Sequence, residues 1–122
     1  MTRGVHLIAE LNSCDSSRLN DPKFVESSVR IAANLGHVTI LHGYFHQFEP
    51  EGVTGFLCLS ESHIAIHTWP TQKYAAVDIY TCGEKSLPQV ILNSLSEAFG
   101  AEEVRVNRVE RGGIEFTGKS LS

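Results

Sequence analysis

The sequence IAIHTWPTQKYAAVDIYTC, residues 64–82, contains two runs of β-branched and aromatic residues separated by a turn that includes Pro70. Such runs are typical of β-strands, and a short turn allows two strands to lie antiparallel. Upstream, residues 38–48 and 53–59 have the same character and are separated by the turn-forming residues 49–52. These segments predict an antiparallel sheet at the centre of the fold.

Two helices are expected outside this region. Asp21-Pro22 offers an N-cap followed by proline at the first helical position, and this helix should end before Gly36. Leu87-Pro88 begins a second helical pattern, which Gly100 closes. Residues 6–11 and 104–109 predict the first and last strands. The order β-α-β-β-β-β-α-β predicts an α+β fold, a two-layer sandwich with a mainly antiparallel sheet and both helices on one face.

Size and composition limit the class of protein. The chain has 122 residues, 42% of them hydrophobic, so we expect a single domain that spans residues 1–122. A chain this small forms a deep pocket more easily between two subunits than within one, which favours a dimer. The net charge of -4 and the scattered basic residues argue against nucleic-acid binding. No apolar run approaches the length of a membrane span and no cleavable leader is visible, so we expect a cytoplasmic protein that does not bind membranes.

Histidines and cysteines raise the question of a metal site. His63 and His67 lie four residues apart, as do His42 and His46, and histidine is a common zinc ligand. Neither pair carries the glutamate of an H-E-x-x-H motif, and the three cysteines are widely spaced without a C-x-x-C pair. We therefore expect free thiols and no metal site.

Residues 59–70, LSESHIAIHTWP, concentrate reactive side chains. Ser62 and His67 fit a nucleophile and its base, because a serine hydroxyl needs a neighbour that accepts its proton, and Cys82 offers a second proton carrier. Strand alternation places Ser62 and His67 on opposite faces, so Ser62 should lie at a bend before the regular strand. On spacing alone, the same residues also fit a turn serine, a satisfied histidine and a buried thiol.

The sequences of residues 59–70 and 74–83, with HLIAE at residues 6–10, resemble the short prokaryotic S-adenosylmethionine decarboxylases. This resemblance implies a proenzyme in which the Ser62 hydroxyl attacks the Glu61 carbonyl. Cleavage between Glu61 and Ser62 would give residues 1–61 and 62–122 and convert Ser62 into a pyruvoyl cofactor. The pyruvoyl ketone would bind the amine of S-adenosylmethionine as a Schiff base and accept electrons as carbon dioxide leaves. The product would be the aminopropyl donor for spermidine synthesis.

The resemblance also implies roles for individual residues. His67 is assigned to processing, and Cys82 is the general acid that reprotonates the carbanion. Phe48 and Trp69 match aromatic positions that flank the adenine ring of the substrate. Thr54 keeps, for processing, the hydroxyl that a serine often supplies in the family. The short members of the family are dimers of processed protomers with active sites near the interface, so we expect a homodimer.

One position departs from the pattern of the family. Thr71 follows Trp-Pro where a glutamate is usual, and that glutamate is associated with the ribose hydroxyls of the substrate. Nucleoside recognition would then be weaker, or another residue would supply it. Two other functions stay open: a pyruvoyl-dependent ornithine or arginine decarboxylase on the same scaffold, and an unprocessed, non-enzymatic binding or regulatory module.

Overall fold

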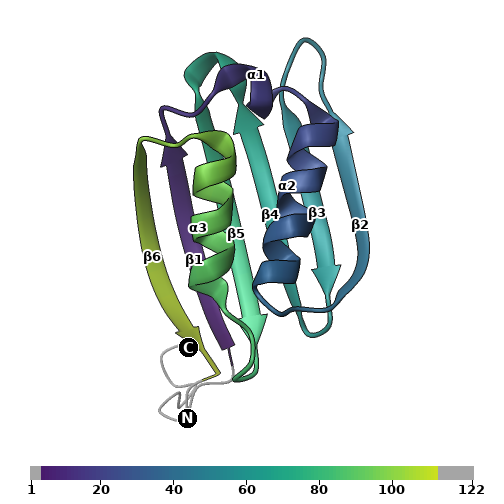
Figure 1. Cartoon of the computed structure of the whole chain (residues 1–122), viewed down its shortest axis with the longest axis vertical. Helices are drawn as coiled ribbons and strands as arrows, with labels where there is room; N and C mark the ends of the chain where they lie inside the picture. The colour runs from purple at the N-terminus through teal and green to yellow at the C-terminus, as the bar shows by residue number, and fades with distance from the viewer. Residues whose placement is uncertain (1–3, 113–122) are drawn as a thin grey trace, which may run out of the picture.

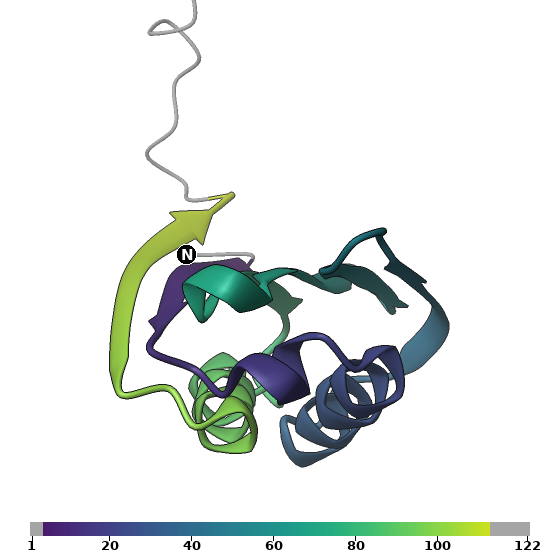
Figure 2. The ribbon, with the colours of Figure 1, turned by 90° about the horizontal axis from the view of Figure 1, so that it is seen from above.

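The computed structural model describes residues 4–112, which form a six-stranded sheet with helices against one face (Figures 1 and 2). The strands are β1 (Gly4–Asn12), β2 (Ile40–Gln47), β3 (Val53–Leu59), β4 (Ser62–Trp69), β5 (Tyr74–Cys82) and β6 (Glu103–Arg111). The helices are α1 (Ser16–Leu19), α2 (Pro22–Leu35), α3 (Pro88–Phe99) and the 3-10 turn η1 (Pro70–Gln72). The sheet order is β2-β3-β4-β5-β1-β6, and every neighbouring pair is antiparallel. The predicted α+β sandwich is confirmed.

The two longer helices begin and end at the predicted signals. The Asp21 side chain accepts hydrogen bonds from the first two amides that follow Pro22, and Gly100 ends α3 in a left-handed conformation with φ of 66°. The short elements α1 and η1 are missing from the sequence-based order. Helix α1 has only four residues and buries only Leu19, so it has no apolar periodicity to reveal it.

The core lies between the helices and one face of the sheet. Side chains alternate along β5 between buried and half-buried, as expected for a strand with one covered face. Helices α2 and α3 fill the layer with side chains that are almost completely buried: Val25, Val29, Ala32, Ala33, Ile91, Leu92, Leu95 and Phe99. These residues pack against one face of the sheet only.

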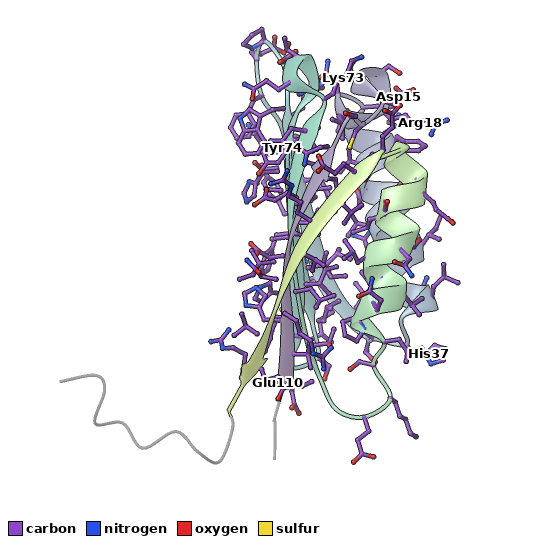
Figure 3. All side chains as sticks on the ribbon, turned by 90° about the vertical axis from the view of Figure 1, so that its left-hand side faces the viewer. Asp15, Arg18, His37, Lys73, Tyr74 and Glu110 are labelled. Atoms are coloured by element: carbon purple, nitrogen blue, oxygen red, sulfur yellow. The ribbon has the colours of Figure 1, made fainter. Side chains whose placement is uncertain are left out.

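The other face of the sheet, here called the open face, has no helix against it in the described part of the chain (Figures 2 and 3). It carries large exposed side chains: Tyr44 is 64% exposed, Phe56 45% and Trp69 43%. They come from three neighbouring strands, β2, β3 and β4. Apolar exposure over adjacent strands is typical of a surface that packs against another one. None of the helices within residues 4–112 is long and apolar enough to cross a membrane.

A buried hydroxyl ties three elements together near one end of the sheet. Thr68 Oγ1 accepts a hydrogen bond from the Val53 amide (2.9 Å) and donates to the Leu19 carbonyl (2.8 Å). Thr68 is only 5% exposed, so water cannot easily replace these partners. The contact holds the start of β3 and the end of α1 against β4.

Replacing Thr68 with valine should lower the free energy of unfolding by about 1–3 kcal/mol, because the substitution keeps the side-chain shape and leaves two buried backbone groups unpaired. Denaturant-induced unfolding measures the effect. Thr68→Ser is the matched control, since it keeps the hydroxyl and loses only a methyl group. Equal stability of Thr68→Val and the native chain would show that the bridge contributes nothing.

Candidate active site

The turn between β3 and β4 presents Ser62 at one end of the sheet. Only Ser60 and Glu61 connect the strands, and Leu59 pairs with Ser62. Glu61 has φ of 63°, in the left-handed region that costs a residue with a side chain about 1–2 kcal/mol. The Ser62 hydroxyl donates to the Ser60 carbonyl at 3.1 Å. Ser62 is the first residue of β4, at the bend that strand alternation requires.

Cys82, the last residue of β5, reaches this turn. Its thiol donates to the Glu61 carbonyl with an Sγ–O distance of 3.0 Å. Tyr80 lies two residues earlier on the same face, and its hydrogen bond with Cys82 raises the pKa of Tyr80. Tyr80 therefore stays neutral near pH 7 and keeps its proton beside the thiol. A hollow of about 390 Å³ is lined by Glu61, Ser62 and Cys82 together with residues from the loops nearby.

A second group of predicted residues lies at the opposite end of the strands. Thr54 and His67 are paired on β3 and β4, and a hydrogen bond of 3.1 Å joins Thr54 Oγ1 and His67 Nδ1. These two residues, Phe48 and Trp69 line one hollow of about 310 Å³. Both ends can be followed in Figure 1, where the β3–β4 turn lies at the bottom and the end of β4 at the top.

Tyr74, on the neighbouring strand, holds the Trp69 ring in place. It stacks on Tyr74 with ring centroids 5.2 Å apart and an interplanar angle of 22°. The Tyr74 hydroxyl donates to the Glu10 carboxylate, which raises the pKa of Tyr74 to about 12. The neutral phenol and the carboxylate fix the stack, so the indole ring offers a preorganised flat surface to a ligand.

The predicted site residues therefore lie in two separate groups, here called half-sites. The first half-site contains Glu61, Ser62 and Cys82; the second contains Phe48, Thr54, His67 and Trp69. Five residues of strand separate Ser62 from His67, a distance of about 16 Å along β4. A single chain does not bring the Ser62 hydroxyl and the His67 ring together.

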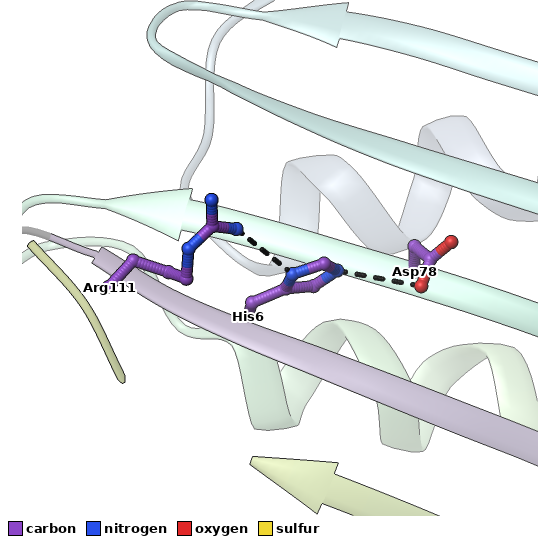
Figure 4. Close-up of polar contacts among 3 residues, drawn as sticks. All are labelled: His6, Asp78 and Arg111. Carbon is purple, nitrogen blue, oxygen red and sulfur yellow. Dashed lines mark hydrogen bonds and ion pairs between the residues drawn. The ribbon is translucent and has the colours of Figure 1, made fainter. Parts of the chain in front are cut away.

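A polar cluster of His6, Asp78 and Arg111 lies on the open face, and no sequence motif predicts it (Figure 4). Arg111 Nη1 donates to His6 Nδ1 at 3.3 Å, which leaves the ring proton on His6 Nε2, 3.5 Å from Asp78 Oδ1. The Arg111 guanidinium also lies 5.3 Å from the centroid of the Tyr80 ring. Alternation from Cys82 places Tyr80 and Asp78 on its face, but the sequence carries no signal that brings Arg111 to His6.

Cys14, Cys58 and Cys82 are free, as expected, and burial raises the pKa of Cys14 to about 11. Within residues 4–112, no three His, Cys, Asp or Glu side chains are grouped as ligands around one point.

Comparison with known proteins assigns the chain and its fold to one family. The profile of the S-adenosylmethionine decarboxylase family matches residues 5–112. The chain belongs to this family. It is 44% identical to the S-adenosylmethionine decarboxylase proenzyme of Acidithiobacillus ferrooxidans, over 94% of this chain and 86% of that protein. It is 46% identical to the proenzyme of Moorella thermoacetica, over 92% of this chain and 90% of that protein.

A solved structure of an adenosylmethionine decarboxylase has the same fold as this chain. The crystal structure of the adenosylmethionine decarboxylase from Aquifex aeolicus superposes with a TM-score of 0.87 at 29% identity, and the match covers 97% of this chain and 98% of that one. The resemblance to the family is thus confirmed over nearly the whole chain. These relatives are adenosylmethionine decarboxylases by name, and none of them favours an ornithine or arginine decarboxylase or a non-enzymatic module.

His63 should make stability depend on pH. Its ring lies among His6, Phe56 and Tyr80, with centroids 5.7–6.0 Å away. Desolvation, and next the charge of His6, lower the pKa of His63 below its usual 6.5. A histidine with a lowered pKa contributes stability above about pH 6.5 that is lost as the pH falls through the pKa of the folded state. Denaturant unfolding at pH 7.5 and 5.5 should therefore show a smaller loss of stability for His63→Gln than for the native chain. An equal loss in both proteins would contradict this origin.

Proposed function

We propose that this chain is the proenzyme of a pyruvoyl-dependent S-adenosylmethionine decarboxylase, cut between Glu61 and Ser62 into residues 1–61 and 62–122. The observation that carries the proposal is the 3.0 Å hydrogen bond from the Cys82 thiol to the Glu61 carbonyl, at the peptide bond to be broken. Membership of the family supplies the substrate. The roles of the remaining residues follow from the resemblance to this family and from where these residues lie relative to Glu61 and Ser62.

Cleavage begins at the Glu61 carbonyl. The Ser62 hydroxyl oxygen adds to the carbonyl carbon, the C–N bond breaks, and the Ser62 amine is released as an ester forms. The Cys82 thiol is placed to stabilise the negative charge that develops on the Glu61 oxygen. Removal of the Ser62 α-proton then expels the Glu61 carboxylate and leaves a dehydroalanine at position 62. Water replaces the nitrogen of this dehydroalanine, and the nitrogen leaves as ammonia. The left-handed Glu61 favours the reaction, because cleavage releases its backbone strain.

The base that removes the Ser62 α-proton is His67 of the second half-site, supplied by another copy of the chain. In the tautomer that leaves His67 Nε2 free, Nδ1 donates to Thr54 Oγ1. We infer a homodimer in which two open faces pack with their strands antiparallel. This arrangement places the His67 end of one protomer over the Ser62 end of the partner, and it buries Tyr44, Phe56 and Trp69.

Decarboxylation uses the same residues around the converted Ser62. The surroundings fit a pyruvoyl group, because residue 62 lies in an open hollow beside a thiol donor instead of in the packed core. This group supplies an electron sink for the electrons that carbon dioxide leaves behind. Cys82 holds the proton that must return to carbon, with the neutral Tyr80 hydroxyl beside it as a further proton donor. The aromatic rings of Phe48 and Trp69 receive the flat adenine and the sulfonium cation.

Substitutions at the first half-site separate processing from turnover. Ser62→Ala should give an intact chain of about 13 kDa without activity, since no hydroxyl is available for attack. Cys82→Ala should slow cleavage and reduce carbon dioxide release more strongly, by roughly 10²- to 10⁴-fold, because a general acid is lost from turnover. Intact mass and release of labelled carbon dioxide are the measurements. Normal turnover by Ser62→Ala would rule out the scheme.

Mixed dimers test whether two chains share a site. Coexpression of Ser62→Ala and His67→Ala chains should restore about a quarter of native activity, because half of the dimers are mixed and one of their two sites carries no substitution. Each variant alone should be inactive. If both half-sites belonged to one chain, every site would carry a lesion and the mixture would stay inactive. Separate tags on the two chains allow the mixed dimer to be purified before the assay.

A further inference from the structure

The turn between β2 and β3 places a carboxylate in the hollow that contains His67. Glu51 lines this hollow together with Phe48, Thr54 and Trp69. Among the described residues that line this hollow, Glu51 alone carries a carboxyl group. Glu51 is itself half-buried, and it also reaches an adjacent polar hollow that includes Ser16, Ser17 and Asn20. The carboxylate therefore stands where an aromatic surface meets a polar one.

One oxygen of this carboxylate is fixed and the other is available. Glu51 Oε2 accepts hydrogen bonds from the Thr71 amide (3.1 Å) and the Thr71 hydroxyl (2.6 Å). Within residues 4–112, Oε1 accepts no hydrogen bond from the protein. Two donors on one oxygen orient the group without using its full capacity as an acceptor. A ligand with hydroxyl donors can use the remaining capacity without rearrangement of the turn.

We propose that Glu51 binds the ribose hydroxyls of the substrate nucleoside, while Phe48 and Trp69 hold the base. The inference rests on the proposed function, because it takes an adenosine moiety as the ligand. A carboxylate accepts hydrogen bonds from two neighbouring hydroxyls more strongly than a neutral group does. Thr71 acts as a positioning residue, since it contacts Glu51 instead of the ligand. Glu51 thereby determines specificity for a ribonucleoside over compounds that share only the flat ring or the positive charge.

Trp69 allows a binding measurement that needs no turnover. It is the only tryptophan of the chain, so fluorescence quenching reports occupancy of the hollow that it lines. The processed full-length enzyme is titrated with adenosine and with 2′,3′-dideoxyadenosine. We expect the dideoxy nucleoside to bind at least roughly tenfold more weakly to the native enzyme, as for the loss of a hydrogen bond to a charged group. In Glu51→Gln this preference should fall to about twofold or less.

A neighbouring substitution controls for charge and folding. Glu49→Gln removes a carboxylate from the same turn, where Glu49 is exposed and outside the lining of the hollow, and should leave the preference unchanged. The assay of carbon dioxide release from S-adenosylmethionine should show a raised KM for Glu51→Gln with a similar kcat. Thermal unfolding of both variants shows whether the turn itself has been weakened.

Three results would overturn the assignment of Glu51. These are equal binding of the two nucleosides by the native enzyme, an unchanged preference in Glu51→Gln, and no quenching by either nucleoside. A Glu51→Gln protein that is less stable yet still prefers adenosine to 2′,3′-dideoxyadenosine would show that Glu51 only stabilises the contact between the β2–β3 turn and η1. The proposed function fails separately: a Glu51-dependent preference without carbon dioxide release would support the nucleoside site and overturn the reaction.

Discussion

The covering of only one face of the sheet is the constraint on which the rest of this molecule depends. Helices α2 and α3 cover the strand side chains that point toward them, and the alternate residues of the same strands point to the open face. Cys82, Tyr80, His67 and Trp69 all belong to this second set. Their positions are fixed by a packed layer to which they contribute almost nothing. The chemistry can therefore change without loss of the core, and the core can be repacked without displacement of the chemistry.

Regular elements were largely accessible from the sequence because their signals are local. Proline and glycine mark both ends of α2 and α3, and alternation marks the strands to within two residues of their observed bounds. The missed helix α1 shows the limit of this reasoning. Its cap, Asp15, accepts from the Arg18 amide as a helix cap should, but four residues cannot display a helical period. The aspartate and serines there fit a turn equally well.

The candidate site was only partly predictable, for a reason of geometry. Strand alternation correctly places Ser62 and His67 on opposite faces of β4. It also places Tyr80, two residues before Cys82, on the same face as Cys82. The contact between Glu51 and Thr71 depends on the path of the β2–β3 turn, and that between His6 and Arg111 on the pairing of the first strand with the last. Such contacts join residues that are 20 and 105 positions apart. No short-range pattern encodes them, because they exist only after the sheet order is set.

The order β2-β3-β4-β5-β1-β6 has a consequence for the proposed cleavage between Glu61 and Ser62. A piece that ends at Glu61 would contribute β1, β2 and β3, and a piece that begins at Ser62 would contribute β4, β5 and β6. The two sets interleave in the sheet, since β4 and β5 lie between β3 and β1, and β6 lies beyond β1. Separation of the pieces would break three ladders at once, so a protein cut at this position would hold together without a covalent link. Reassembly after complete denaturation would be an encounter between two polypeptides and would depend on concentration, whereas the precursor folds as one chain.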